Sequence, residues 1–131
     1  MRILFVDDDD DVRRSMQECL TARNHEVRSY ASAREGLAIL EFYKPELVIS
    51  YIQMPGMDGI ELLSQIRETN LELPVILMTS ELTVDTAVRA LRKRANDYLR
   101  KPVGLKALLE SIERIRCRGA GRGGAGGKER T

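Results

Sequence analysis

Histidine and cysteine are scarce in this sequence of 131 residues. It holds one histidine, His25, and two cysteines, Cys19 and Cys117, which lack the close spacing of metal ligands. A single histidine leaves no Ser/His/Asp constellation, and neither a P-loop nor a dinucleotide-binding glycine motif occurs. We therefore expect that the protein is not an enzyme in the ordinary sense. Two isolated cysteines are typical of free thiols in a reducing compartment.

Long hydrophobic runs are also missing, because no segment approaches the roughly 20 apolar residues that cross a membrane. The apolar run 3–6 is too short for a signal peptide and leads directly into aspartates. Hydrophobic residues make up 43% of the chain and charged residues 31%, which is typical of one globular domain with a real core. We expect a cytoplasmic protein without membrane association.

A strong excess of charge of one sign is absent as well. The net charge of +1 argues against nucleic-acid binding by the chain as a whole. The segment 118–131 nevertheless carries four basic residues and one acidic residue, a net of 4 − 1 = +3. It also contains most of the glycines and no large apolar side chain, so we expect a flexible tail or linker at 118–131 after a domain at 1–117. RNA contact by this tail is the alternative interpretation.

Five short apolar runs alternate with helical patterns along the domain. A continuous apolar run is typical of a parallel strand that is buried on both faces. The expected strands lie at 3–6, 26–30, 47–51, 75–78 and around 98–99. This alternation predicts an α/β fold with a doubly wound, five-stranded parallel sheet in three α/β/α layers. We choose the flavodoxin-like strand order 2-1-3-4-5.

The helical patterns predict which side chains face the core. Ser32 is placed to begin the second helix and Asp58 or Gly59 the third, and Asn24 is suited to a left-handed residue after the first helix. We expect the apolar stripe of each helix to face inward. For the fourth helix these residues are Val84, Val88, Leu91 and Ala95, and for the fifth Leu105, Leu108, Leu109, Ile112 and Ile115.

Polar side chains stand where the strands end. They are Asp7, Asp8, Tyr51, Thr79, Ser80 and Lys101. In the expected strand order these ends meet at one edge of the sheet, where α/β proteins place their chemistry. Carboxylates bind Mg²⁺, while an amine and a hydroxyl can bind phosphoryl oxygens. The pattern therefore predicts a site for a divalent cation and a phosphoryl group.

Four motifs, ILFVDDDDDVRRS, LVISYIQMPGMDGIELL, LPVILMTS and NDYLRKP, cover nearly all of residues 1 to about 116. In order and spacing the sequence resembles the CheY-like receiver domain of bacterial two-component response regulators. Receivers that precede DNA-binding or AAA+ transcription-activator modules are the most similar. The resemblance implies signalling by phosphorelay with a sensor histidine kinase or another signalling protein as partner. It also implies an output module beyond the C-terminus, and a homodimer through the fourth helix, fifth strand and fifth helix.

The resemblance also implies a role for each matching residue. Asp7 and Asp8 match the acidic pair that binds Mg²⁺, and Gln53 matches the residue whose backbone carbonyl also binds the metal. Lys101, with Thr79 and Ser80, corresponds to the phosphoryl pocket. Thr79 and Tyr98 match the pair that switches conformation on activation.

Tyr51 occupies the position of the phosphoacceptor aspartate. In the family a carboxylate attacks phosphorus and forms an acyl phosphate. A phenol, with a reference pKa of about 10, is mostly protonated at neutral pH and offers no carboxylate oxygen to Mg²⁺. We therefore expect no catalytic residue, and weak or absent Mg²⁺ binding. Arg94 is a second departure, at a position that usually holds a left-handed glycine.

Three functional hypotheses remain at this point. The first is a degenerate receiver, or pseudo-receiver, that acts as a protein-interaction and regulatory module. The second is a phosphorylatable receiver that carries a substitution at Tyr51 or uses Ser50, Asp8 or Ser80 as acceptor, although Ser50 should point to the opposite face of the strand. The third is nucleic-acid binding through the basic tail, which we do not expect for this domain.

Overall fold

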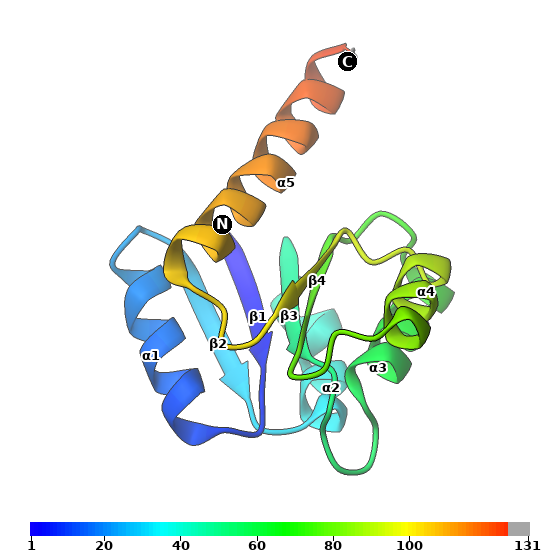
Figure 1. Cartoon of the computed structure of the whole chain (residues 1–131). Helices are drawn as coiled ribbons and strands as arrows, with labels where there is room; N and C mark the ends of the chain where they lie inside the picture. Colours follow the sequence, from blue (N-terminus) through cyan, green and yellow to red (C-terminus); the bar gives the residue numbers. More distant parts are fainter. Residues whose placement is uncertain (126–131) are drawn as a thin grey trace.

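The computed structural model describes residues 1–125 and the side chains of residues 1–118. Strands and helices alternate along the chain, as Figure 1 shows. The strands are β1 (Arg2–Val6), β2 (Glu26–Tyr30), β3 (Leu47–Tyr51), β4 (Val75–Thr79) and β5 (Asp97–Arg100). The helices are α1 (Asp10–Thr21), α2 (Ala33–Tyr43), α3 (Gly59–Thr69), α4 (Val84–Arg92) and α5 (Leu105–Ala125). The strands form one parallel sheet in the order β2-β1-β3-β4-β5, so the predicted topology is confirmed.

The sheet is buried on both faces, which explains its continuous apolar strands. On β1, Leu4 and Val6 face the core beneath α2 and α3, while Ile3 and Phe5 face the core beneath α1 and α5. All four side chains are fully buried. Two separate cores therefore share one sheet, and the carboxyl ends of its strands meet at one edge.

Short polar residues begin the helices at the expected places. Ser32 and Asp58 are the N-caps of α2 and α3, and each accepts a hydrogen bond from a backbone N–H of the first turn. Asn24 lies in the left-handed region with φ of 68°, as predicted. Arg94 does so with φ of 66°, which places an arginine in the conformation that glycine adopts most readily.

The predicted orientation of α4 is wrong for most of its apolar stripe. Val84, Val88 and Leu91 are 82%, 37% and 75% exposed, whereas Ala90 is buried. Helix α4 therefore packs against the rest of the protein through Ala90 and not through its larger apolar side chains. Apolar periodicity predicts that a stripe exists, but it does not specify whether the sheet or a partner covers it.

Helix α5 is longer than the sequence predicts. Leu108, Ile112 and Ile115 are buried as expected, and beyond them the helix runs on to Ala125, away from the sheet (Figure 1). Once a helix is nucleated by packing, each further residue adds one backbone hydrogen bond. The tail expected at 118–131 is thus helical over 118–125, and residues 126–131 lie outside the described part. Between residues 1 and 125, no helix is both long and apolar enough to cross a membrane.

A close backbone approach places the start of α3 against the end of β3. A Cβ atom added to Gly59 would lie 2.3 Å from the carbonyl oxygen of Tyr51 and 2.9 Å from Cα of Ile52. Only glycine leaves room for this contact. The contact brings the loop 52–58 and the end of β3 together at the edge where the polar residues lie.

Candidate functional site

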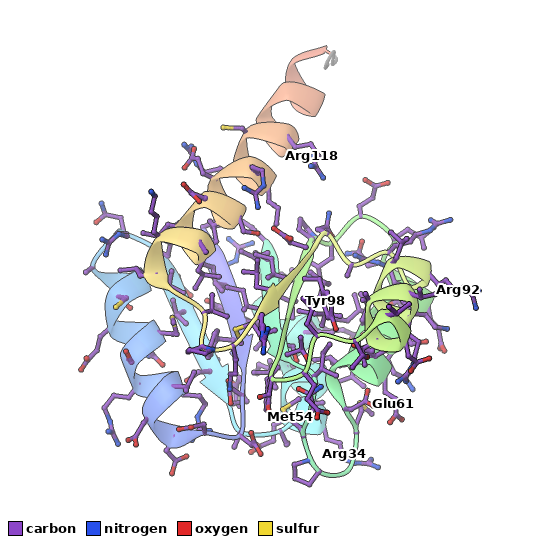
Figure 2. The ribbon with its side chains drawn as sticks, in the orientation of Figure 1. Arg34, Met54, Glu61, Arg92, Tyr98 and Arg118 are labelled. Atoms are coloured by element: carbon purple, nitrogen blue, oxygen red, sulfur yellow. The ribbon has the colours of Figure 1, made fainter. Side chains whose placement is uncertain are left out.

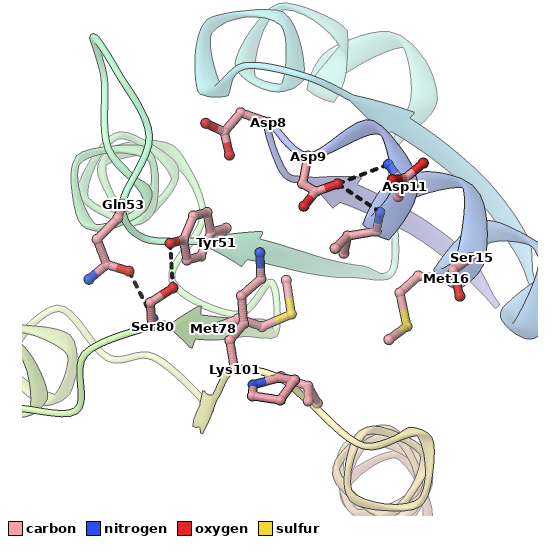
Figure 3. A pocket seen from close by; sticks show the side chains of 13 residues that line it. Asp8, Asp9, Asp11, Ser15, Met16, Tyr51, Gln53, Met78, Ser80 and Lys101 are labelled. Atoms are coloured by element: carbon pink, nitrogen blue, oxygen red, sulfur yellow. Dashed lines mark hydrogen bonds between the residues drawn. The ribbon is translucent and has the colours of Figure 1, made fainter.

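A hollow of about 860 Å³ opens at the carboxyl edge of the sheet (Figure 3). The ends of β3 and β4 and the segments after β1 and β5 contribute to it. Its lining residues are Asp8, Asp9, Asp11, Val12, Ser15, Met16, Tyr51, Gln53, Met78, Ser80, Lys101, Pro102 and Val103. The structure therefore brings together most of the strand-end residues that the sequence singled out. Asp7 and Thr79 are fully buried next to it.

Lys101 lies between a carboxylate and an aromatic ring. Its Nζ atom is 2.7 Å from Oδ2 of Asp7 and 3.7 Å from the centroid of the Tyr51 ring. The side chain of Asp7 is fully buried and that of Lys101 is 17% exposed. Because few waters reach this pair, both the ion pair and the cation–π contact are stronger than they would be at the surface. Lys101 thus has two partners within the protein.

The hydroxyl group of Tyr51 reaches the end of the neighbouring strand. It forms a hydrogen bond of 2.5 Å with Oγ of Ser80 (Figure 3). The ring of the same side chain contacts Lys101. Tyr51 therefore spans the site from the lysine after β5 to the serine after β4, and it contacts two of the groups expected to bind a phosphoryl group.

Gln53 contributes its side chain, which the sequence did not predict. Its Oε1 accepts a hydrogen bond of 3.0 Å from the backbone N–H of Ser80, and its Nε2 donates one of 2.8 Å to Oγ1 of Thr79. Thr79 in turn donates to the backbone oxygen of Glu81 at 2.9 Å. The Thr79 hydroxyl is therefore held by Gln53 and the β4–α4 loop. The only signal in the sequence was an amide two residues after the strand end.

Tyr98 is tied to α4 and does not line the hollow. Its hydroxyl group forms a hydrogen bond with Oγ1 of Thr86 in the first turn of α4. Thr86 also forms a capping box with Thr83. The Tyr98 side chain is half-buried and packs against the core on the α2 and α3 face, where Figure 2 labels it beside β4. Tyr98 thus contacts the first turn of α4, whereas Thr79 contacts the loop before it.

The residues present do not fit the Mg²⁺ arrangement that the resemblance implies. Asp8 offers an exposed carboxylate to the hollow, but Asp7 is already paired with Lys101. The third position holds the phenol of Tyr51. Residues 1–125 contain no group of three or more His, Cys, Asp or Glu side chains placed to bind one metal ion.

Ser50 and Ser80 differ as alternative phosphoacceptors. Ser50 is fully buried and donates a hydrogen bond to the backbone oxygen of Tyr51, while Ser80 is exposed at the rim of the hollow. A phosphodonor can reach Ser80 and Asp8 but not Ser50 in this conformation.

Comparison with known proteins agrees with the fold. The family model described as response regulator receiver domain matches residues 3–113. The response regulator protein FleR of Pseudomonas aeruginosa is 42% identical over 113 residues, which cover 86% of this chain and 24% of FleR. The regulatory protein AtoC of Escherichia coli is 40% identical over 113 residues, which cover 86% of this chain and 24% of AtoC. The chain spans about a quarter of the length of these relatives.

Solved structures show the same architecture. A CheY-like receiver domain protein from Methanospirillum hungatei is 34% identical with a TM-score of 0.84, covering 88% of this chain and 93% of that protein. The chemotaxis protein CheY4 of Vibrio cholerae is 27% identical with a TM-score of 0.83, covering 87% and 97%. The family match and the strand order agree. This chain therefore belongs to the response regulator receiver domain family.

Proposed function

We propose that this chain is a degenerate receiver, which regulates its partners through protein contacts and without phosphorylation at position 51. One observation carries the proposal: Tyr51 contacts both Lys101 and Ser80 within the hollow. The side chain thereby occupies the place where a phosphoryl group would meet the same two residues. The domain is a regulatory module of the cytoplasm and not an enzyme.

The chemistry of position 51 supports this proposal. Acyl phosphate formation needs a carboxylate nucleophile, and Tyr51 has none to offer. Receiver domains generally bind Mg²⁺, with a carboxylate at this position among the ligands. Because Asp7 is paired with Lys101 and Tyr51 has a phenol, we infer that this chain binds Mg²⁺ weakly or not at all.

The hydrogen bonds around Tyr51 suggest how the domain is held in one state. They run from the Tyr51 hydroxyl to Ser80, from the Ser80 N–H to Gln53, and from the Gln53 amide to Thr79. Thr79 then holds Glu81 in the β4–α4 loop. In this proposal Tyr51 provides permanently the contacts that set the loop before α4.

The partners follow from the family and remain part of the proposal. A receiver domain generally interacts with histidine kinases and output domains, and the match covers only 24% of relatives such as FleR and AtoC. The exposed stripe of Val84, Val88 and Leu91 supports an interface on α4. We propose that this face forms a homodimer through α4, β5 and α5. We also propose that an output module follows the receiver domain beyond the C-terminus.

Intact-mass measurement after incubation with Mg²⁺ and acetyl phosphate tests the proposal. The parent protein should gain no phosphoryl group, whereas Tyr51→Asp should gain one. Tyr51→Phe is the control, because it removes the hydroxyl group without adding a nucleophile. A phosphorylated parent protein would contradict the proposal, and peptide mapping would then decide between Ser80 and Asp8 as the acceptor.

A further inference from the structure

A second, smaller hollow lies between the carboxyl-terminal ends of α3 and α4. It measures about 300 Å³ and is lined by Ser64, Arg67, Glu68, Leu71, Arg92, Lys93 and Arg94. Four of these side chains are cationic and one is anionic, which gives a net of 4 − 1 = +3. Helices that follow parallel strands end at the opposite edge of the sheet from the strand ends. The hollow is therefore separate from the Tyr51 site.

Cations at a helix end usually neutralise its exposed carbonyl groups, and here Arg67 already does so. Its guanidinium group donates hydrogen bonds to the backbone oxygens of Asn70, Leu73 and Arg94, at 3.1, 2.7 and 2.8 Å. It also donates to Oδ1 of Asn96 at 3.2 Å. These three carbonyl groups thus have a hydrogen-bond partner in Arg67 and need none of the other cations.

The cations on the α4 side have no comparable partners. Among the described residues, no ion pair joins the side chain of Arg92 or Lys93 to a carboxylate within 4.0 Å. Figure 2 shows Arg92 pointing outward from α4, away from the body of the protein. Burial, and next to it the charge of Arg94, lower the pKa of the Arg67 guanidinium group, while the charge of Glu72 offsets part of this effect. Positive charge is therefore in excess around this hollow.

An apolar side chain stands close to these charges. Leu71 lines the hollow and is 59% exposed. The lining contains no aromatic residue on which a nucleic-acid base could stack. The exposed leucine, together with Arg92 and Lys93, which form no ion pair with a described residue, is complementary to a peptide that carries both carboxylates and an aliphatic side chain.

We propose that the hollow formed by Arg67, Leu71 and residues 92–94 binds an acidic, leucine-containing segment of a partner protein. Carboxylates of the segment pair with Arg92, Lys93 and Arg94, and an aliphatic side chain packs against Leu71. Binding at this place does not require phosphorylation. It goes beyond the proposed function because it assigns a partner chemistry to a surface remote from position 51.

Fluorescence anisotropy with a labelled peptide tests this proposal. The probe is a peptide of about ten residues with alternating pairs of glutamate and leucine, measured at low and at physiological salt. The double variant Arg92→Ala, Lys93→Ala removes two positive charges. It should weaken peptide binding by about tenfold at low salt, and screening should reduce this effect at higher salt. The parent protein should bind a version of the peptide with glutamine in place of glutamate at least as weakly as the double variant binds the original peptide.

A matched pair of glycine variants separates this charge effect from backbone effects. Arg94→Gly should weaken binding by about threefold. Lys44→Gly removes one positive charge at another left-handed residue, with φ of 51°, which does not line the hollow. That control should change binding by less than about 1.5-fold.

Several outcomes would overturn the proposal. The first is the absence of peptide binding, and the second is that Lys44→Gly weakens binding as much as Arg94→Gly does. The third is that an oligothymidylate of similar charge binds as tightly as the peptide. The last would indicate nucleic-acid recognition at this surface. Phosphorylation of Tyr51→Asp is measured independently, so failure here leaves the proposed function of the Tyr51 site untouched, and the reverse also holds.

Discussion

Arg94 illustrates how much a single residue can depend on its backbone conformation. Its φ of 66° lies in the left-handed region, where a Cβ atom is crowded by the neighbouring carbonyl group. Arg67 donates a hydrogen bond to the Arg94 carbonyl oxygen and so helps to hold the backbone in this conformation. The arginine side chain itself is not needed for that bond, so the conformational cost can be tested separately from the charge.

We predict that Arg94→Gly raises the free energy of unfolding by about 1 kcal/mol, because glycine adopts a positive φ without steric cost. Urea denaturation at neutral pH measures the change. Arg94→Ala is the control, since alanine loses the charge but keeps the crowded Cβ atom. Equal stabilisation by both variants would show that charge, and not backbone strain, is the cause.

At the scale of elements, β5 is joined to α5 by the carboxylate of Asp97. It accepts hydrogen bonds from Oγ of Ser111 at 2.6 Å and from the guanidinium group of Arg114 at 2.7 Å, and from the backbone N–H of Tyr98 at 2.8 Å. Burial alone would raise the pKa of Asp97, but these hydrogen bonds and the Arg114 charge outweigh it and lower the pKa below its usual value. The ionised form therefore stabilises the fold.

The sign of the resulting pH dependence follows from linkage. A carboxyl group whose pKa is lower in the folded state contributes stability above the unfolded pKa, near 4, and loses it as pH falls through the folded pKa. We predict that Asp97→Asn destabilises the protein at neutral pH and that the difference from the parent shrinks below about pH 4. Urea unfolding from pH 7 to pH 3 measures it. A difference that stays constant would contradict the role of the charge.

The junction of β3 with α3 gives a second prediction at this scale. In Gly59→Ala the new Cβ atom would meet the Tyr51 carbonyl oxygen, so the backbone must shift. We expect a loss of about 2–3 kcal/mol in the free energy of unfolding. Gly104→Ala is the control, since nothing lies within 4 Å of its added Cβ, and it should cost less than about 1 kcal/mol. Chemical denaturation compares the two variants.

The elements also show what sequence reasoning can and cannot reach. The convergence of Asp8, Tyr51, Ser80 and Lys101 was predictable, because neighbouring parallel strands end at one edge. The direction of the Gln53 side chain was not, since it depends on a hydrogen bond to a loop that is distant in sequence. The exposed face of α4 was missed because periodicity does not tell which of two faces the sheet covers.

The whole molecule consists of two cores on either side of one sheet. Ile66 on α3 belongs to one core and Ile112 on α5 to the other, and both are almost fully buried. The sheet contributes alternate side chains to both cores, so neither core can form without it. We therefore expect one cooperative unfolding transition with independent local contributions from the two sides.

We predict that Ile66→Val and Ile112→Val each lower the free energy of unfolding by about 1 kcal/mol. In the double variant the losses should add within about 0.5 kcal/mol, because the sites share no contact across the sheet. Circular dichroism and tyrosine fluorescence should report the same transition in urea. Different midpoints for the two signals would instead indicate that the two sides unfold separately.

The Tyr51 side chain also affects how long the domain stays in one signalling state. A phosphoryl group is removed by hydrolysis and so gives an ordinary receiver a built-in timer, whereas a side chain lasts as long as the polypeptide. If Tyr51 is the permanent occupant of its pocket, the domain keeps no memory of past stimuli and cannot be reset. Its partners would then respond to dose, that is, to how many copies are synthesised and how quickly they are degraded.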